Sequence, residues 1–187
     1  MGTIEFHGWG APVDDVERPD RLVIDLDPDE GLAFEDVKAA ALEIRDHLKD
    51  TGLVSFPMLT GGKGVHVIAP LHPSADWTEV KDFASRFARA IASAEPERFT
   101  ATMSKAKRKG RIFIDWLRNQ RGSTAILPYS PRARSGASVA VPIAWNELKD
   151  HDSGADFTIK DFDKLQRRAG SAAMQGWGEA EQILPEL

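Results

Sequence analysis

Two kinds of apolar patterning run along the chain and predict strands and helices separately. Alternating or continuous apolar runs bounded by Pro, Gly or Asp are typical of strands. Apolar residues that recur every three or four positions are typical of helices packed on one face. The strand pattern occurs at residues 3–9, 21–27, 54–59, 65–71, 111–117 and 123–130. The helix pattern occurs at residues 33–52 and 76–96, and short helices are expected at residues 145–149, 161–170 and 174–184.

The two long helices each have a defined apolar face. Gly52 stands where the first helix is expected to end, because glycine readily adopts the left-handed conformation of a C-cap. The inner face of the first helix consists of Val37, Ala40, Ala41, Ile44 and Leu48, and that of the second consists of Val80, Phe83, Phe87 and Ile91.

Residues 54–71 predict a hairpin around the turn TGGKG. In its second strand, Val65, Val67 and Ala69 share one face, and His66 and Ile68 share the other. Mixed helices and strands with a hairpin indicate an α+β fold with a mostly antiparallel sheet flanked by helices. The length of 187 residues suits one domain, residues 1–187.

Composition narrows the classes of protein further. No apolar run approaches the roughly 18 residues of a membrane span, so no membrane partner is expected. The chain has no cysteine, which excludes disulfides and cysteine-ligated zinc and fits a reducing compartment.

Charge is distributed unevenly along the chain. The formal net charge is −5, yet residues 104–134 contain nine Lys or Arg and one acidic residue. Such a segment fits either a phosphate-binding surface or a solvated loop. Residues 105–111 are expected to be mobile without DNA, because they bury too little apolar surface to order themselves.

Two apolar strand patterns end in carboxylates. Asp25 and Asp27 follow Leu22–Ile24, and Asp115 follows Ile112–Ile114. Residues two apart on a strand point to the same face, so Asp25 and Asp27 are expected side by side. An isolated Asp-x-Asp is more often a polar strand end, but a neighbouring strand carrying Asp115 would bring three carboxylates together at one edge of the sheet. Such a cluster can hold two divalent ions for phosphoryl or nucleotidyl transfer.

The turn TGGKG offers a complementary anion site. Adjacent glycines let backbone N–H groups turn toward an anion, and Lys63 adds positive charge. Alone, the turn is usually only a hairpin and His66 a hydrogen-bonded strand residue. Beside the aspartates, Thr60, Lys63 and His66 become candidate triphosphate ligands.

Together these stretches resemble the polymerase domain of the bacterial ligase D enzymes of non-homologous end joining. That domain belongs to the archaeo-eukaryotic primase superfamily. The matching stretches are IEFHGW, ERPDRLVIDLDPDE, TGGKGVHVIAPL, GRIFIDWLRNQRGSTAILPYSPRAR and VAVPIAWNEL. The resemblance implies a primase-type catalytic unit that adds nucleotides to DNA 3′ ends in double-strand break repair. It also implies a two-ion Mn²⁺ or Mg²⁺ site and a cytoplasmic, nucleoid-associated location.

The resemblance assigns roles to individual residues. Asp25, Asp27 and Asp115 match the catalytic, metal-binding triad. The nucleotide-binding set is Thr60, Lys63, His66, Arg108, Arg132 and His7. The expected DNA-binding set is Lys105, Lys107, Lys109, Arg118 and Arg121, of which the resemblance supports Arg118 and the positive charge of the segment supports the others. Implied partners are DNA ends, nucleoside triphosphates, Ku and a DNA ligase.

One departure from the family leaves alternatives open. Family domains usually begin roughly a hundred residues earlier, about a small domain's length. Without that segment an apolar patch is expected at the surface, and a second copy of the chain is one candidate to cover it. The alternative to a polymerase is a nucleotide- and DNA-binding module that cannot extend primers alone. A magnesium phosphohydrolase built on Asp25 and Asp27 is a third reading, and it gives the turn TGGKG no role.

Overall fold

A six-stranded sheet forms the centre of the computed structural model, which describes residues 3–187. Neighbouring strands are antiparallel except the first pair in the order, which is parallel. The mostly antiparallel α+β fold expected from the sequence is therefore confirmed. The strands in spatial order are β5 (Phe99–Thr100), β6 (Ile112–Asp115), β2 (Arg21–Pro28), β4 (Val65–Pro70), β3 (Phe56–Leu59) and β8 (Val141–Pro142).

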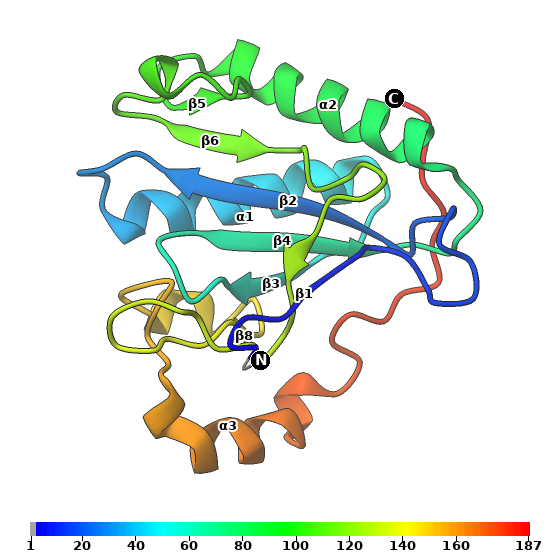
Figure 1. Ribbon diagram of the computed structural model, residues 1–187. Coiled ribbons are helices and arrows are strands. Elements are labelled where there is room, and N and C mark those ends of the chain that lie inside the picture. The colour runs from blue at the N-terminus through cyan, green and yellow to red at the C-terminus, as the bar shows by residue number, and fades with distance from the viewer. Residues whose placement is uncertain (1–2) are drawn as a thin grey trace.

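Two helices, α1 (Phe34–Asp50) and α2 (Trp77–Ala94), pack on the same face of this sheet (Figure 1). Leu22, Ile24 and Leu26 of β2 point into the core with them and are completely buried. Every residue predicted for the inner faces of the two helices is buried. The sheet therefore has one face committed to the hydrophobic core.

The opposite face of the sheet is covered only in part. Val23, Met58 and Ile68 form a small second apolar cluster there with Ile126. Ile126 belongs to β7 (Ala125–Ile126), which pairs with β1 (His7–Gly8) as a separate two-stranded ribbon. Because side chains alternate along a strand, Asp25 and Asp27 lie on this same face as Val23.

The first helix ends as the glycine pattern predicts. Gly52 has a φ of 91°, and its N–H donates to the carbonyl of Lys49 at 2.9 Å. The N–H of Leu53 donates to the carbonyl of Leu48 at 2.9 Å. These two bonds form a Schellman motif, which satisfies carbonyls that the helix end would leave unpaired.

The prediction of a C-terminal helix at residues 174–184 is wrong. Only a 3-10 turn at Ala172–Met174 and the short helix α3 (Phe162–Ala169), preceded by a 3-10 turn at Ile159–Asp161, form in this region. Gly176 and Gly178 have φ values of 74° and 79°, which interrupt a right-handed helix. Trp177 instead donates from Nε1 to the carbonyls of Pro57 and Ile143 and joins the apolar cluster on the open face.

Several short elements also differ from the pattern-based expectation. The strands expected at residues 3–9 and 123–130 are reduced to β1 and β7, two residues each. The helix expected at residues 145–149 is a 3-10 turn at Leu148–Asp150. β5 and β8 were not predicted, since two residues are too few to show a period. In the described part of the chain, no helix is both long and apolar enough to cross a membrane.

Candidate active site

Three polar side chains form one row across the open face of the sheet. His66 of β4 is paired in register with Asp25 of β2, and Asp25 is paired with Asp115 of β6. Residues directly opposite each other on adjacent strands project to the same side. The register therefore brings His66, Asp25 and Asp115 together, and Asp27 follows two positions along β2.

The carboxylates meet on the face of the sheet, and the expectation that they meet at one edge is wrong. Asp115 ends β6, whereas Asp25 lies within β2, because the two strands run antiparallel with an offset. Antiparallel strands that both ended in Asp without an offset would place those residues at opposite edges. The short length of β6 is what brings Asp115 alongside Asp25.

Glycines let the turn between β3 and β4 lie close to this row. A Cβ on Gly64 would stand 2.1 Å from the carbonyl oxygen of Leu26, so only glycine fits beside β2. Gly61 has a φ of 67°, and a Cβ there would stand 2.7 Å from Cγ of Arg132. The Thr60 hydroxyl closes the turn by donating to the Gly64 carbonyl at 3.0 Å.

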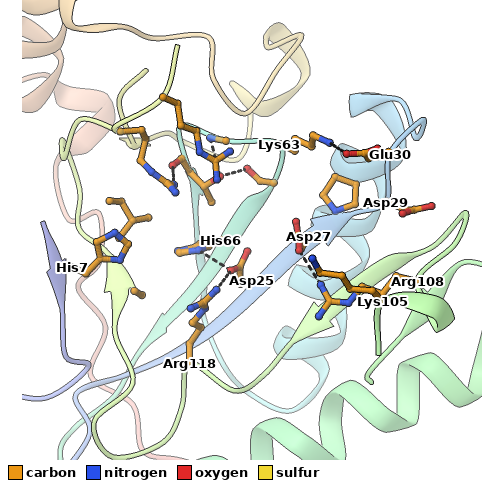
Figure 2. Close-up of a pocket in the computed structure, with 18 residues that line it drawn as sticks. His7, Asp25, Asp27, Asp29, Glu30, Lys63, His66, Lys105, Arg108 and Arg118 are labelled. Carbon is orange, nitrogen blue, oxygen red and sulfur yellow. Dashed lines mark hydrogen bonds and ion pairs between the residues drawn. The ribbon is translucent and has the colours of Figure 1, made fainter. Parts of the chain in front are cut away.

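Two members of the row, His66 and Asp25, line a cleft of about 620 Å³ together with the turn (Figure 2). Its acidic side includes Asp25 and Asp27, and basic side chains come from several other segments of the chain. Most predicted site residues line the cleft, namely Asp25, Asp27, Thr60, Lys63, His66, Arg108, Arg132, His7, Lys105 and Arg118.

Each carboxylate faces a guanidinium group. One nitrogen of Arg118, Nη2, lies 3.2 Å from Oδ2 of Asp25 and 3.3 Å from Oδ2 of Asp115. Arg108 Nη1 lies 3.1 Å from Oδ2 of Asp27. Two arginines thus neutralise only part of the charge of three acidic side chains, and Figure 2 shows Asp25 between Arg118 and His66.

The three carboxyl groups differ in acidity. Burial would raise the pKa of Asp25, but the charges and hydrogen bonds of His66 and Arg118 hold this pKa below its usual value. Burial raises the pKa of Asp27, and the nearby charge of Asp25 adds to that rise. Burial also raises the pKa of Asp115, although Arg118 opposes the effect. The positive charge near Asp27 and Asp115 is therefore too small to offset the effect of burial on the pKa of these two groups.

The donor chemistry of the cluster fits a divalent cation. Within residues 3–187, no three His, Asp or Glu side chains are arranged closely enough to hold a metal ion as they stand. Arg118 and Arg108 form ion pairs with the carboxylates that would hold the cation. Three carboxylates are nevertheless the hard oxygen ligands that Mg²⁺ and Mn²⁺ prefer, so the metal site stays a prediction.

His66 is more enclosed than its strand pattern suggested. His66 is 3% exposed, and its Nε2 lies 3.4 Å from Oδ2 of Asp25. Its Nδ1 is buried without a hydrogen-bond partner. Lys63, in contrast, has a side chain that is 57% exposed and lies 3.6 Å from Glu30. The two predicted phosphate ligands therefore differ in how much of the fold depends on them.

The basic segment at residues 105–111 was expected to be mobile because of its polarity, but it contains a regular turn and contacts the rest of the fold. A 3-10 turn forms at Lys105–Lys107, and Arg108 stacks 3.8 Å from the centroid of the Phe113 ring. The carboxylate of Asp29 accepts a hydrogen bond from the Gly110 N–H at 2.8 Å. These contacts fasten the segment to β6 and to the end of β2.

Some predicted residues lie outside the lining of the cleft. Asp115 is turned toward Arg118 and the Leu117 N–H, while Lys107 lines a separate depression beside α2. Arg121 forms a bidentate ion pair with Glu17 at 2.6 to 3.0 Å. Lys109 is exposed near the start of β6.

Several lining or supporting residues were not assigned to the site by the sequence analysis. Asp29, Glu30 and Arg134 line the cleft. Asn119 is 2% exposed, and its side chain bonds both the N–H and the carbonyl of Val23 at 2.7 Å. Asn119 thereby fixes the chain next to Arg118 against β2. The only sequence signal for a role of Arg134 in the site was its position within the basic segment at residues 104–134.

The fold and the site together define a primase-polymerase domain. The family model described as "LigD, primase-polymerase domain" matches residues 1–172, and the chain belongs to this family. A solved structure, the polymerase domain of Mycobacterium tuberculosis ligase D in complex with DNA, matches with a TM-score of 0.74 and 36% identity. The match covers 84% of this chain and 55% of that chain.

Curated relatives are non-homologous end joining proteins. The chain is 40% identical over 171 residues to the multifunctional non-homologous end joining protein LigD of Pseudomonas aeruginosa. It is 42% identical over 154 residues to the LigD of Mycobacterium tuberculosis. These matches cover 91% and 79% of this chain, and in each case the chain spans 20% of the relative's length.

Proposed function

We propose that the chain catalyses metal-dependent addition of nucleotides to DNA 3′ ends during the repair of double-strand breaks. The observation that carries the proposal is the row of His66, Asp25 and Asp115, of which His66 and Asp25 line the same cleft as Lys63 and Arg132. Acidic and basic groups facing each other across one cleft suit a triphosphate and the cations that accompany it.

In this proposal the carboxylates are the metal ligands. Asp25 and Asp27 would hold both ions, and Asp115 would complete the position nearest the attacking 3′ hydroxyl. Two Mn²⁺ or Mg²⁺ ions supply Lewis acidity that makes a hydroxyl more nucleophilic and balances the charge of the phosphates. Arg118 and Arg108 would turn from the carboxylates toward phosphate oxygens, since both are always charged and can exchange one anion for another.

The nucleotide would lie against the glycine turn. The exposed ammonium group of Lys63 can reach a phosphate, while the closed turn of Thr60 holds the backbone in place. The other proposed triphosphate contacts are His66, Arg108, Arg132 and His7.

DNA would approach over the basic segment. Lys105 lines the cleft, and Lys107 and Lys109 lie on the same segment. Arg118 and Arg121 would complete this surface, Arg121 by exchanging its ion pair with Glu17 for a phosphate. The solved relative is a polymerase domain in complex with DNA, which supports this part of the proposal.

The names of the relatives refer to non-homologous end joining. We propose that the chain acts with a DNA ligase and Ku at broken DNA ends in the bacterial cytoplasm. Ile4 and Phe6 are 57% and 52% exposed, and we propose that a second copy of the chain covers them.

Primer extension on a gapped DNA with a 5′ phosphate, run with a manganese titration, tests the activity. The wild-type chain should extend the primer, and Asp25→Asn and Asp115→Asn should each reduce the rate at least about 100-fold. Asp82→Asn, which changes an exposed carboxylate on α2, is the matched control and should extend normally. Equal extension by all variants would refute the roles of the aspartates.

The alternative is a nucleotide- and DNA-binding module that does not extend primers by itself. It is retained because the chain spans 55% of the solved polymerase domain that it matches. Nucleotide binding by the wild-type chain without primer extension at any manganese concentration would favour this alternative.

A further inference from the structure

Glu5 contacts two of the residues that line the cleft, His7 and Arg132. Its Oε2 is 2.9 Å from Nε2 of His7, and its Oε1 is 3.3 Å from Nε of Arg132. The same Oε1 accepts a hydrogen bond from the Ala133 N–H at 2.7 Å. One carboxylate therefore links the N-terminal segment to the loop that carries Arg132.

Arg132 extends this connection to the glycine turn. Its Nη1 donates to the Thr60 carbonyl at 2.7 Å, and its side chain is 13% exposed. The bonds to Glu5 and Thr60 use Nε and Nη1, so the N–H groups of Nη2 remain for another acceptor. Glu5 thus helps to hold a guanidinium group in one orientation at the edge of the turn.

The N-terminal segment is itself anchored directly after Glu5. The Phe6 N–H donates to the Ser130 hydroxyl at 2.7 Å, and the Phe6 carbonyl accepts from the Leu127 N–H at 3.0 Å. His7 and Ile126 are paired in register between β1 and β7. The carboxylate of Glu5 is consequently held at a fixed place and is not a freely moving surface group.

The Glu5 carboxylate is stabilised in its charged form. Hydrogen bonds from His7 and from the Ala133 backbone, together with the charge of Arg132, lower the pKa of Glu5 to about 2. The side chain therefore stays ionised throughout the neutral range and remains a permanent charge-assisted acceptor.

We propose that Glu5 is a positioning residue for nucleotide binding, which orients His7 and Arg132 toward the phosphates of a nucleoside triphosphate in the cleft. The inference rests on the proposed function, because it takes a triphosphate as the ligand. Holding both side chains in place before the ligand arrives reduces the entropy lost on binding. Without Glu5, each side chain has to be ordered by the nucleotide itself.

Calorimetry with two probes tests the role of Glu5: dATP with Mn²⁺, and inorganic triphosphate without metal. Glu5→Ala should weaken the binding of both probes tenfold or more. Glu5→Gln keeps a carbonyl oxygen for Arg132 and Ala133, and should bind within threefold of the wild type. Asp15→Ala, which removes another carboxylate of the N-terminal segment with its ion pair to Arg18, is the matched control and should bind like the wild type.

A double-mutant cycle separates positioning from a general effect on the fold. Because Glu5 acts in part through Arg132, adding Glu5→Ala to Arg132→Ala should cost clearly less affinity than the tenfold expected in the wild-type background, and the remaining loss reports on His7. Fully additive losses would overturn the inference. Should Glu5→Ala fail to fold in a thermal melt, Glu5→Asp, which is one methylene shorter, takes its place and should also bind tenfold more weakly.

The outcomes distinguish this inference from the proposed function. Wild-type binding of both probes with unchanged affinity in Glu5→Ala would overturn the role of Glu5 alone. Failure of the wild-type chain to bind either probe would overturn the proposed function and the role of Glu5 with it.

Discussion

Asp25 and Asp115 stand directly opposite each other on the adjacent antiparallel strands β2 and β6. Like charges in opposed positions destabilise a sheet, and burial increases the repulsion. Arg118 contacts both carboxylates through a single nitrogen and offsets part of this cost. The arrangement weakens the sheet unless a positive charge is present, which is expected of a site that binds cations.

A divalent cation should therefore stabilise the folded chain. A ligand that binds only the folded state at 100 times its dissociation constant adds about 2.7 kcal/mol to the free energy of unfolding. We expect Mn²⁺ to raise the thermal midpoint of the wild-type chain in differential scanning calorimetry. The rise should disappear in a variant that combines Asp25→Asn, Asp27→Asn and Asp115→Asn, and persist in Asp82→Asn. The same rise in all variants would place the ion elsewhere.

Lys63→Ala and His66→Ala should separate nucleotide binding from stability. Lys63 is exposed, and its ion pair with Glu30 contributes at most about 1 kcal/mol, so Lys63→Ala should weaken triphosphate binding and leave unfolding almost unchanged. His66 is buried against Asp25, so His66→Ala should also lower the free energy of unfolding by about 1 to 3 kcal/mol.

Calorimetric titration with dATP and Mn²⁺, together with urea unfolding, measures both effects of these substitutions. Unchanged nucleotide affinity in both variants would contradict the phosphate-binding role of the turn.

Gly64→Ala should damage the fold at the site. The added Cβ would meet the Leu26 carbonyl oxygen at 2.1 Å, so either β4 or β2 has to shift. Overpacking of this kind costs about 1 to 3 kcal/mol, measurable as a lower urea midpoint. Gly170→Ala is the control, because its Cβ would have no neighbour within 4 Å and φ there is −97°. Equal stability of the two variants would show that the close approach of the turn is not required.

DNA binding should weaken steeply with salt. Each phosphate contact contributes a slope of roughly −0.7 to −0.9 in log K against log salt, so three or four contacts give about −2 to −4. Lys107→Ala combined with Lys109→Ala should flatten the slope by roughly 1.5 if both contact the DNA backbone. Fluorescence anisotropy with a labelled gapped duplex at several salt concentrations measures this slope.

Lys49→Ala combined with Lys160→Ala removes two exposed lysines outside the basic segment and is the control. A slope reduced equally by both pairs would show that only the net charge matters. Binding that is independent of salt would rule out the basic segment as the DNA contact.

Much of the framework could be predicted because it depends on local periodicity. The inner faces of α1 and α2 follow from the spacing of apolar residues, and Gly52 ends α1 because few other residues adopt its φ. The placement of Asp25 and Asp27 on one face of β2 follows from alternation along a strand. The family motifs likewise identified most of the residues that line the cleft.

Only the tertiary structure decided how these parts meet. The offset of β6 against β2 places Asp115 beside Asp25, and strand register depends on packing and pairing between segments far apart in the sequence. The burial of His66, the position of Arg118 between two carboxylates and the links from Glu5 to Arg132 also join distant segments. The sequence by itself therefore determined which residues are available for the chemistry, and the long-range contacts decided which of them face one another.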